Sequence, residues 1–148
     1  MKRILTIFLF AFLTACGTDS GLRTVEPVID SDLSGTWLLR RAELGGKVVP
    51  MPGFEVQIAG DRYRAGAGSL NDRGRLVLFG DELAGQHKRI DVVGEDGPNK
   101  GKRYPAIYRL TANGRELEIC YDLSQQDRPA NFVSPEGSQV LRVNYSKK

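Results

Sequence analysis

The sequence is poor in the residues that usually form catalytic and metal sites. Its 148 residues include only two cysteines and a single histidine, His87. A tetrahedral zinc site takes four ligands, most often from cysteine and histidine, and this chain offers too few of them. It also has no HExxH or G-x-S-x-G motif and no recognisable Ser-His-Asp set. We therefore predict a protein that is not an enzyme, with no metal site and no cofactor, and a surface position for His87.

A hydrophobic run long enough to cross a membrane is also missing. The main apolar run, from Ile4 to Leu13, would form a helix of about 15 Å, roughly half of a ~30 Å hydrocarbon core. Because Lys2 and Arg3 precede it, the run is typical of a secretory signal peptide, which we place at residues 1–15. Without those two cations the formal net charge falls from +3 to +1, which argues against a nucleic-acid partner.

The first cysteine, Cys16, follows the apolar run almost directly. An ordinary cleavage after Ala15 would put Leu13 where a small residue is preferred, so a plain secretory signal is the weaker alternative. The residues from Leu13 to Cys16 resemble the bacterial lipobox, in which the cysteine sulfur takes a diacylglycerol. The resemblance implies a lipoprotein with acyl chains such as palmitate on Cys16, anchored in the membrane. With Gly17 next, it implies the outer membrane, facing the periplasm.

The segment after the lipidation site has no hydrophobic periodicity. Residues 17–32 mix Gly, Ser, Thr and Asp with one Pro, so we predict a flexible tether over 16–32, with a reach of about 20–24 Å. Lipidation of Cys16 would leave Cys120 as the only thiol, which excludes an intramolecular disulfide. Alternation places Cys120 beside Glu118 and Asp122, whose charges would raise the thiol pKa, and we interpret it as structural.

From residue 33 to 148 the chain has the pattern of short strands and turns. Apolar residues alternate with polar ones in runs bounded by Gly, Pro, Asn and Asp, and no window has the pattern of an amphipathic helix. About eight strands with short links favour an all-β, single up-and-down antiparallel barrel. The expected strands cover residues 36–44, 54–60, 62–66, 75–80, 88–94, 106–110, 115–121 and 139–145.

Period-two alternation also predicts which side chains face the barrel interior. The inward set consists of large apolar residues and two tyrosines: Phe54, Val56, Ile58, Ile90, Val92, Leu117, Ile119, Tyr121, Leu141, Val143 and Tyr145. Residues of the opposite parity are expected to be solvated on the outer face: Arg109, Glu116, Glu118 and Arg142.

The start of the first strand resembles a known barrel motif. Gly35-Thr36-Trp37 is similar to the G-x-W motif of lipocalins and fatty-acid-binding proteins, where the tryptophan closes one end of the barrel. Further motifs follow in order, among them Ile107-Tyr108, Leu117-x-Ile119-Cys120-Tyr121 and Arg128-Pro129. Together they resemble an uncharacterised bacterial lipocalin-like domain family over about residues 33–145. The resemblance implies the fold, with Gly35 and Trp37 at the barrel floor, and implies no activity.

One departure from fatty-acid-binding proteins bears on the ligand. That family holds the fatty-acid carboxylate with an R-x-Y pair on its last strand, whereas this chain has Arg142 and Tyr145 with one residue more between them. The extra residue puts the two side chains on opposite faces of the strand. A carboxylate clamp of that type is therefore not expected.

Two loops offer weaker candidate sites. Residues 64–74 are rich in Gly but lack the P-loop pattern, and we predict a long hairpin loop there. Residues 94–105 form the most loop-like stretch, with Lys100, Lys102 and Arg103 together and Lys88 and Arg89 near them if the strands pair suitably. Such a cluster would suit anionic headgroups or glycans, although a solvated charged loop is the simpler interpretation.

Two functional hypotheses remain open at this stage. Either a hollow barrel binds a small apolar ligand, or a filled barrel acts as a structural or protein-interaction module of the cell envelope. An eight-stranded barrel lies between filled and hollow, so the sequence does not separate them, and no ligand-binding residue can be named.

Replacing Cys16 with serine tests the anchor. The variant has no sulfur to alkylate, so we expect it to leave the membrane fraction and to lose incorporation of labelled palmitate. Cell fractionation and metabolic labelling measure both effects. Continued tight membrane association of the serine variant would contradict lipidation at this cysteine.

Overall fold

The structure is a computed structural model that describes residues 28–83 and 87–148. The predicted signal peptide, the predicted lipidation site Cys16 and the predicted tether up to residue 27 lie outside the described residues. No helix in the described part of the chain is long and apolar enough to cross a membrane.

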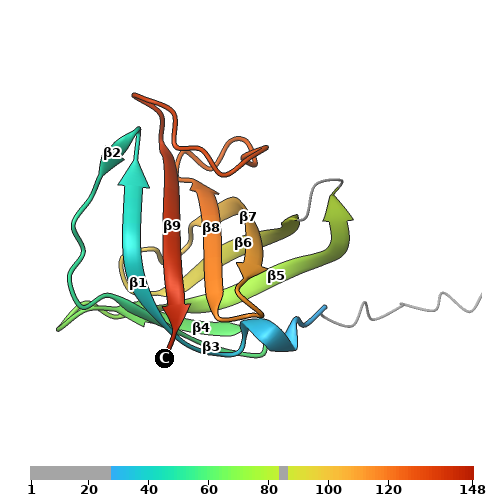
Figure 1. Ribbon diagram of the computed structural model, residues 1–148. Helices are drawn as coiled ribbons and strands as arrows, with labels where there is room; N and C mark the ends of the chain where they lie inside the picture. The colour runs from blue at the N-terminus through green and yellow to red at the C-terminus, as the bar shows by residue number, and fades with distance from the viewer. Residues whose placement is uncertain (1–27, 84–86) are drawn as a thin grey trace, which may run out of the picture.

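The described chain consists of strands and one short 3-10 helix (Figure 1). In chain order the elements are η1 (Ser31–Leu33), β1 (Gly35–Leu44), β2 (Lys47–Val48), β3 (Glu55–Ala59), β4 (Arg62–Gly66), β5 (Asp72–Leu83), β6 (His87–Asp96), β7 (Arg103–Thr111), β8 (Glu116–Asp122) and β9 (Val140–Lys147).

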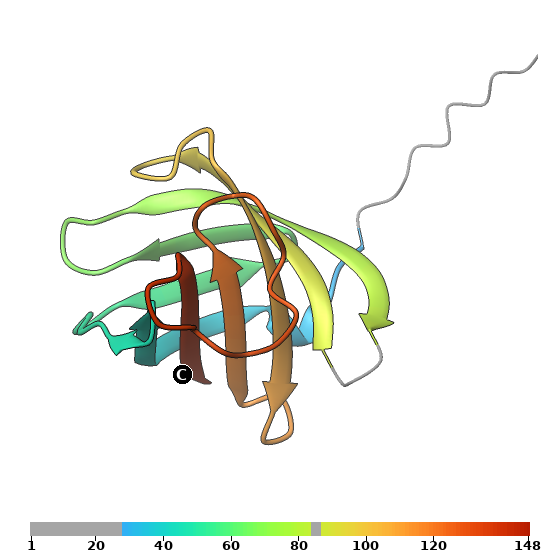
Figure 2. The ribbon, with the colours of Figure 1, turned by 90° about the horizontal axis from the view of Figure 1, so that it is seen from above.

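These strands form one closed antiparallel barrel. Strands β1 and β3 to β9 pair with their neighbours in sequence order, and β9 returns to pair with β1 from Trp37↔Lys147 to Leu44↔Leu141. The two-residue strand β2 is a side branch on the end of β1. Figure 2 shows the strands curving around a common centre. The all-β, up-and-down, lipocalin-like barrel expected from the sequence is confirmed.

Successive connections alternate between the two ends of this barrel. The connections at residues 49–54, 67–71 and 97–102 share one end with the start of the β8–β9 connection, and we call this end the mouth. The turns at 60–61 and 112–115 lie at the other end, the floor, together with η1.

Trp37 packs at the floor, beside η1. Its side chain is fully buried, and its indole N–H donates to the Leu33 carbonyl at 2.7 Å. The Lys147 ammonium lies 5.1 Å from the ring centroid and donates to the Asp32 carbonyl. Gly35 has φ +139°, and a Cβ there would lie 2.8 Å from Lys147 Cε. The positive φ favours glycine at this position, whereas the flexible end of the lysine side chain could move to make room for a Cβ.

The described residues before β1, from Val28 onward, pack against the barrel. Val28 bridges to Leu78, and one Asp30 oxygen accepts hydrogen bonds from Lys88 Nζ at 2.9 Å and Tyr108 Oη at 2.8 Å. Burial opposes ionisation of Asp30, but these two partners lower its pKa below the ordinary value. Residues 28–32, which the sequence placed in the tether, therefore belong to the barrel.

The predicted inward parity is confirmed for the whole apolar set. All eleven residues lie in the hydrophobic core or pack against it. The prediction for the outer face is wrong at Glu118, whose side chain is only 7% exposed. The reason is an outer layer that alternation alone does not reveal.

That layer is the connection between β8 and β9, residues 123–139, which we call the strap. It runs as a wide loop outside the strands (Figure 2). The Cys120 thiol donates to the Val133 carbonyl at 3.7 Å, and Phe132 packs between the Arg109 guanidinium and His87. The strap thus buries the outward side chains of β7 and β8 that a bare barrel would leave in water.

Arg128 holds the strap onto the barrel wall. Its guanidinium donates to the carbonyls of Ile90 and Ala106 at 2.7 and 2.6 Å, and to the buried Asp91 carboxylate at 2.5 Å. Pro105, opposite Asp91 in the β6–β7 ladder, has no N–H to donate. A proline is unusual within a central strand, and the arginine supplies donors beside it.

The two loops proposed from sequence are shorter than expected. Residues 64–66 and 72–74 are paired parts of β4 and β5, so the predicted long hairpin reduces to residues 67–71. The suggested extension of the basic cluster from Lys100, Lys102 and Arg103 to Lys88 and Arg89 is wrong. Arg103 lies opposite Val93 at the mouth end of β6, whereas Lys88 lies opposite Tyr108 near the floor, because antiparallel pairing separates the two ends of a strand.

Removal of the Arg128 side chain tests the role of the strap. Arg128→Ala leaves the buried Asp91 with one cationic partner fewer, and we expect a loss of about 2–3 kcal/mol in the free energy of unfolding. Arg62→Ala is the matched control, because it breaks an exposed pair with Glu95 and should cost below about 1 kcal/mol. Urea denaturation measures both, and equal losses would contradict the anchoring role.

Candidate ligand-binding cavity

The barrel encloses a cavity of about 300 Å³ that opens toward the mouth. Leu70 lines it and is 44% exposed, so the cavity reaches solvent beside the 67–71 connection. Its wall is mostly apolar and comes from nearly every strand of the barrel. The lining residues are Leu33, Leu39, Met51, Phe54, Val56, Ile58, Tyr63, Ala65, Leu70, Asp72, Leu76, Ile90, Val92, Pro98, Asn99, Tyr104, Ile119, Tyr121, Leu123, Leu141, Val143 and Tyr145.

Tyrosine hydroxyls are the main polar groups of the cavity. Four of the five tyrosines in the sequence line it, namely Tyr63, Tyr104, Tyr121 and Tyr145. Tyr121 on β8 and Tyr145 on β9 both line the cavity and influence each other electrostatically. Burial raises the pKa of both phenols above the ordinary value, so they stay uncharged at neutral pH and offer a small polar site in an apolar wall.

A cluster of polar side chains around Asp72 closes one side of the mouth. Asp72 accepts hydrogen bonds from the Asn99 backbone N–H at 3.1 Å, the Asn99 side-chain amide at 2.9 Å and the Tyr63 hydroxyl at 3.0 Å. Tyr104 donates to Asn99 Oδ1 at 2.9 Å. Gly97, with φ +91°, lets the 97–102 connection approach, since a Cβ there would lie 2.4 Å from the Asn71 carbonyl oxygen. These contacts join two mouth connections into one rigid rim.

The charge of the cavity wall differs from that of the outer surface. The chain has 21 lysines and arginines, yet none of them is among the residues that line the cavity. Asp72 is the only lining residue with an ionisable carboxyl group. Tyr145 faces the lumen, whereas Arg142 on the same strand donates to Glu118 on the outer face at 2.7 Å. The predicted separation of these two side chains is confirmed, so a carboxylate clamp cannot form from them.

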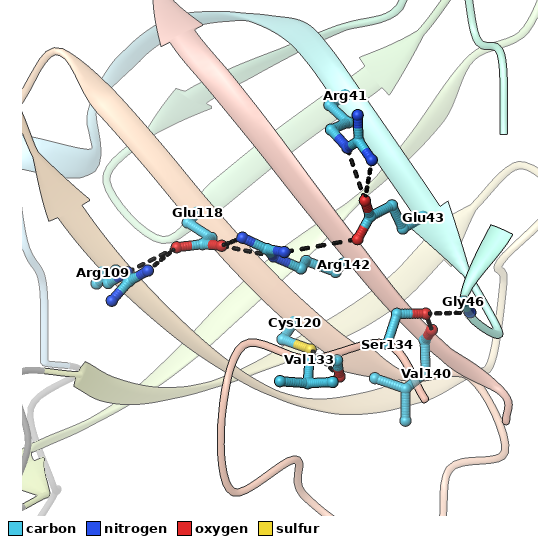
Figure 3. A network of polar contacts seen from close by, with 10 residues as sticks. All are labelled: Arg41, Glu43, Gly46, Arg109, Glu118, Cys120, Val133, Ser134, Val140 and Arg142. Atoms are coloured by element: carbon cyan, nitrogen blue, oxygen red, sulfur yellow. Dashed lines mark hydrogen bonds and ion pairs between the residues drawn. The ribbon is translucent and has the colours of Figure 1, made fainter. Parts of the chain in front are cut away.

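The outer face carries its own network of charges (Figure 3). Glu118 accepts hydrogen bonds from Arg109 at 2.6 Å and from Arg142 at 2.7 Å, so both of its oxygens are paired. Arg142 reaches on to Glu43 at 3.5 Å. A buried carboxylate with two guanidinium partners is well satisfied, and this arrangement is a structural device of the wall under the strap.

Cys120 lies in the same wall and is fully buried. Burial raises the pKa of its thiol to about 11, with a further increase from Glu118 and an opposing effect from Arg142. The predicted raised pKa is confirmed, but its main cause is the cover provided by the strap (Figure 3) and not the neighbouring carboxylates. A thiol in this state is a poor nucleophile.

The remaining candidates from the sequence do not gather into a site. His87 is half-buried and meets Phe132 edge to face at 5.9 Å between ring centroids, so its predicted surface position is only partly right. Within the described residues, no group of three or more His, Cys, Asp or Glu side chains is placed to hold a metal.

No family model, no curated protein and no solved structure matches this chain.

The sequence signals for the cavity were only partly visible. The inward parity identified Tyr121 and Tyr145 as lumen residues, but the rim formed by Asp72 and Asn99 was missed. Its partners lie in different connections, Asn99 in 97–102 and Asp72 after 67–71. A signal was present in the Asn and Asp residues of both segments, although these residue types are equally common in ordinary turns.

Alkylation tests the state of Cys120. Because the thiol is buried and its pKa is about 11, we expect negligible labelling of the folded protein by iodoacetamide at pH 7.5. The same protein in urea should label to completion, which serves as the control. Rapid labelling of the folded protein, measured by mass spectrometry, would contradict a purely structural thiol.

Proposed function

We propose that this protein is a lipid-anchored protein of the cell envelope whose barrel binds a small, largely apolar molecule. The observation that carries the proposal is the apolar cavity of about 300 Å³ that opens at the mouth. Cavities of this size and character are typical of small-molecule sites. The alternative, an interaction module with a filled barrel, fits less well because the lumen holds this space.

The anchor part of the proposal rests on sequence. The lipobox-like residues from Leu13 to Cys16 support lipidation at Cys16 and a place in the outer membrane facing the periplasm. The barrel and its floor residues Gly35 and Trp37 support membership of the bacterial lipocalin-like domain family. A nucleic-acid partner is not part of the proposal, since the mature chain has little excess positive charge.

The chemistry of the described wall supports a binding role as part of the proposal. The buried Cys120 thiol has a raised pKa, and the lumen offers phenols, one amide and one carboxylate that is already paired with three donors. These groups bind and orient a ligand but include no activated nucleophile. The protein is therefore proposed as a carrier or sensor of its ligand.

Filling the cavity tests this proposal. Ala65 lines the cavity and is 9% exposed, so Ala65→Phe should place a ring in the empty space and reduce binding of N-phenyl-1-naphthylamine, an uncharged fluorescent probe, by at least tenfold. Val48→Phe is the control, because Val48 is 58% exposed and is not a lining residue. Fluorescence titration of the chain from residue 28 onward, with circular dichroism to check folding, measures the effect.

Equal probe binding by the two variants would contradict a luminal site. Absence of probe binding by the unaltered barrel would contradict the proposed function as a whole.

A further inference from the structure

The cavity wall has a chemical preference that its shape alone does not reveal. Its lining combines many apolar side chains, four tyrosines and one asparagine with a single carboxylate and no cation. Transfer of a charged group from water into such a wall is strongly unfavourable unless an opposite charge meets it. We therefore expect the lumen to discriminate between ligands mainly by their net charge.

An anionic ligand would find no partner inside. Arg142 and Arg103 are sequence neighbours of lining residues, but their side chains point outward. On the outer face Arg142 is paired with Glu118, and Arg103 is paired with Asp91. The only charge that an anion would meet in the wall is the carboxylate of Asp72, which repels it. A fatty-acid carboxylate is thus excluded by both desolvation and repulsion.

A cationic ligand is also poorly matched. Asp72 is 6% exposed and already accepts three hydrogen bonds, two from Asn99 and one from Tyr63. These donors compensate its charge within the rim, where the carboxylate supports the 97–102 connection. An ammonium group would have to break this arrangement before it could pair with the carboxylate.

The Tyr121 hydroxyl offers what an uncharged polar group of a ligand needs. Of the four tyrosines that line the cavity, Tyr63 and Tyr104 already donate to groups of the rim, and Tyr145 is only 4% exposed. Tyr121, near the mouth end of β8, is the half-buried member of this set, so its hydroxyl is the most accessible to a ligand. It can donate to one oxygen atom of a ligand held among apolar side chains.

We propose that the cavity selects uncharged amphiphiles, molecules with an apolar body and one hydroxyl or carbonyl oxygen that accepts a hydrogen bond from Tyr121. The inference rests on the proposed function, because it presumes that the lumen is the binding site. It adds the class of ligand and the residue that recognises it. Burial raises the pKa of Tyr121, so its phenol stays neutral and its hydrogen bond to the ligand is independent of pH across the neutral range.

Three ligands of equal chain length test the charge preference. Displacement of N-phenyl-1-naphthylamine from the chain starting at residue 28 is compared for 1-decanol, decanoate and decylammonium at pH 7.5, below their micellar concentrations. We expect 1-decanol to displace the probe at a concentration at least tenfold lower than either ion. A smaller ratio for decanoate or for decylammonium overturns the charge preference, while the proposed lumen site stands.

A variant of the recognising residue tests the polar contact. Tyr121→Phe removes one hydroxyl and keeps the ring, so we expect 1-decanol to bind three- to tenfold more weakly and 1-bromodecane, which has no hydroxyl, to bind as before. Tyr108→Phe is the matched control, because this tyrosine lies outside the cavity and donates to Asp30. A loss below threefold for 1-decanol, or an equal loss for 1-bromodecane, overturns the assignment of Tyr121.

Failure of the inference and failure of the proposed function give different results. If the probe binds but the three decyl compounds compete equally, only the ligand class is wrong. If neither the probe nor any decyl compound binds the folded barrel, the luminal site itself is wrong and the inference falls with it.

Discussion

The pairing of β9 with β1 is the constraint on which the rest of this structure depends. An antiparallel sheet of these strands left open would expose two unpaired edges, which invite association with other chains. Closure removes the edges and also divides every strand into an inner and an outer set of side chains. A ring of eight strands can be filled by its inner side chains or can hold one small ligand, and in this barrel a cavity of about 300 Å³ remains. The floor residue Trp37 then decides at which end that cavity is shut.

The outward side chains of some strands are buried as well, and the strap covers them. Side chains such as Cys120 and Ile107 are fully buried although they point away from the lumen, so a second layer must cover them. Residues 123–139 provide it, and Arg128 fastens this layer by bonds to two strand carbonyls and to Asp91. The buried carboxylates of Asp91 and Glu118 under this layer are tolerated because both have guanidinium partners, Arg128 for Asp91 and Arg109 with Arg142 for Glu118. The wall is thus apolar inside and ionic outside.

Alternation of residues predicted the fold and the inner face because period two is a local property of a strand. The eleven inward residues needed only the sequence of their own strands and no knowledge of their neighbours. The strap could not be predicted in the same way, because its residues have no period and its contacts reach strands 22 to 38 positions away in the chain. The buried state of Glu118 was missed for that reason. The rim of Asp72, Asn99, Tyr63 and Tyr104 depends on the meeting of two connections, which only the closed barrel brings about.

The floor also brings together the two ends of the described chain. The Lys148 backbone N–H donates to the Thr36 carbonyl at 2.9 Å, and the Lys147 ammonium donates to the Asp32 carbonyl of η1. Figure 1 shows η1 and the C-terminus at the same end of the barrel. Both ends of the described chain therefore lie opposite the mouth, and neither of them obstructs the entrance to the cavity.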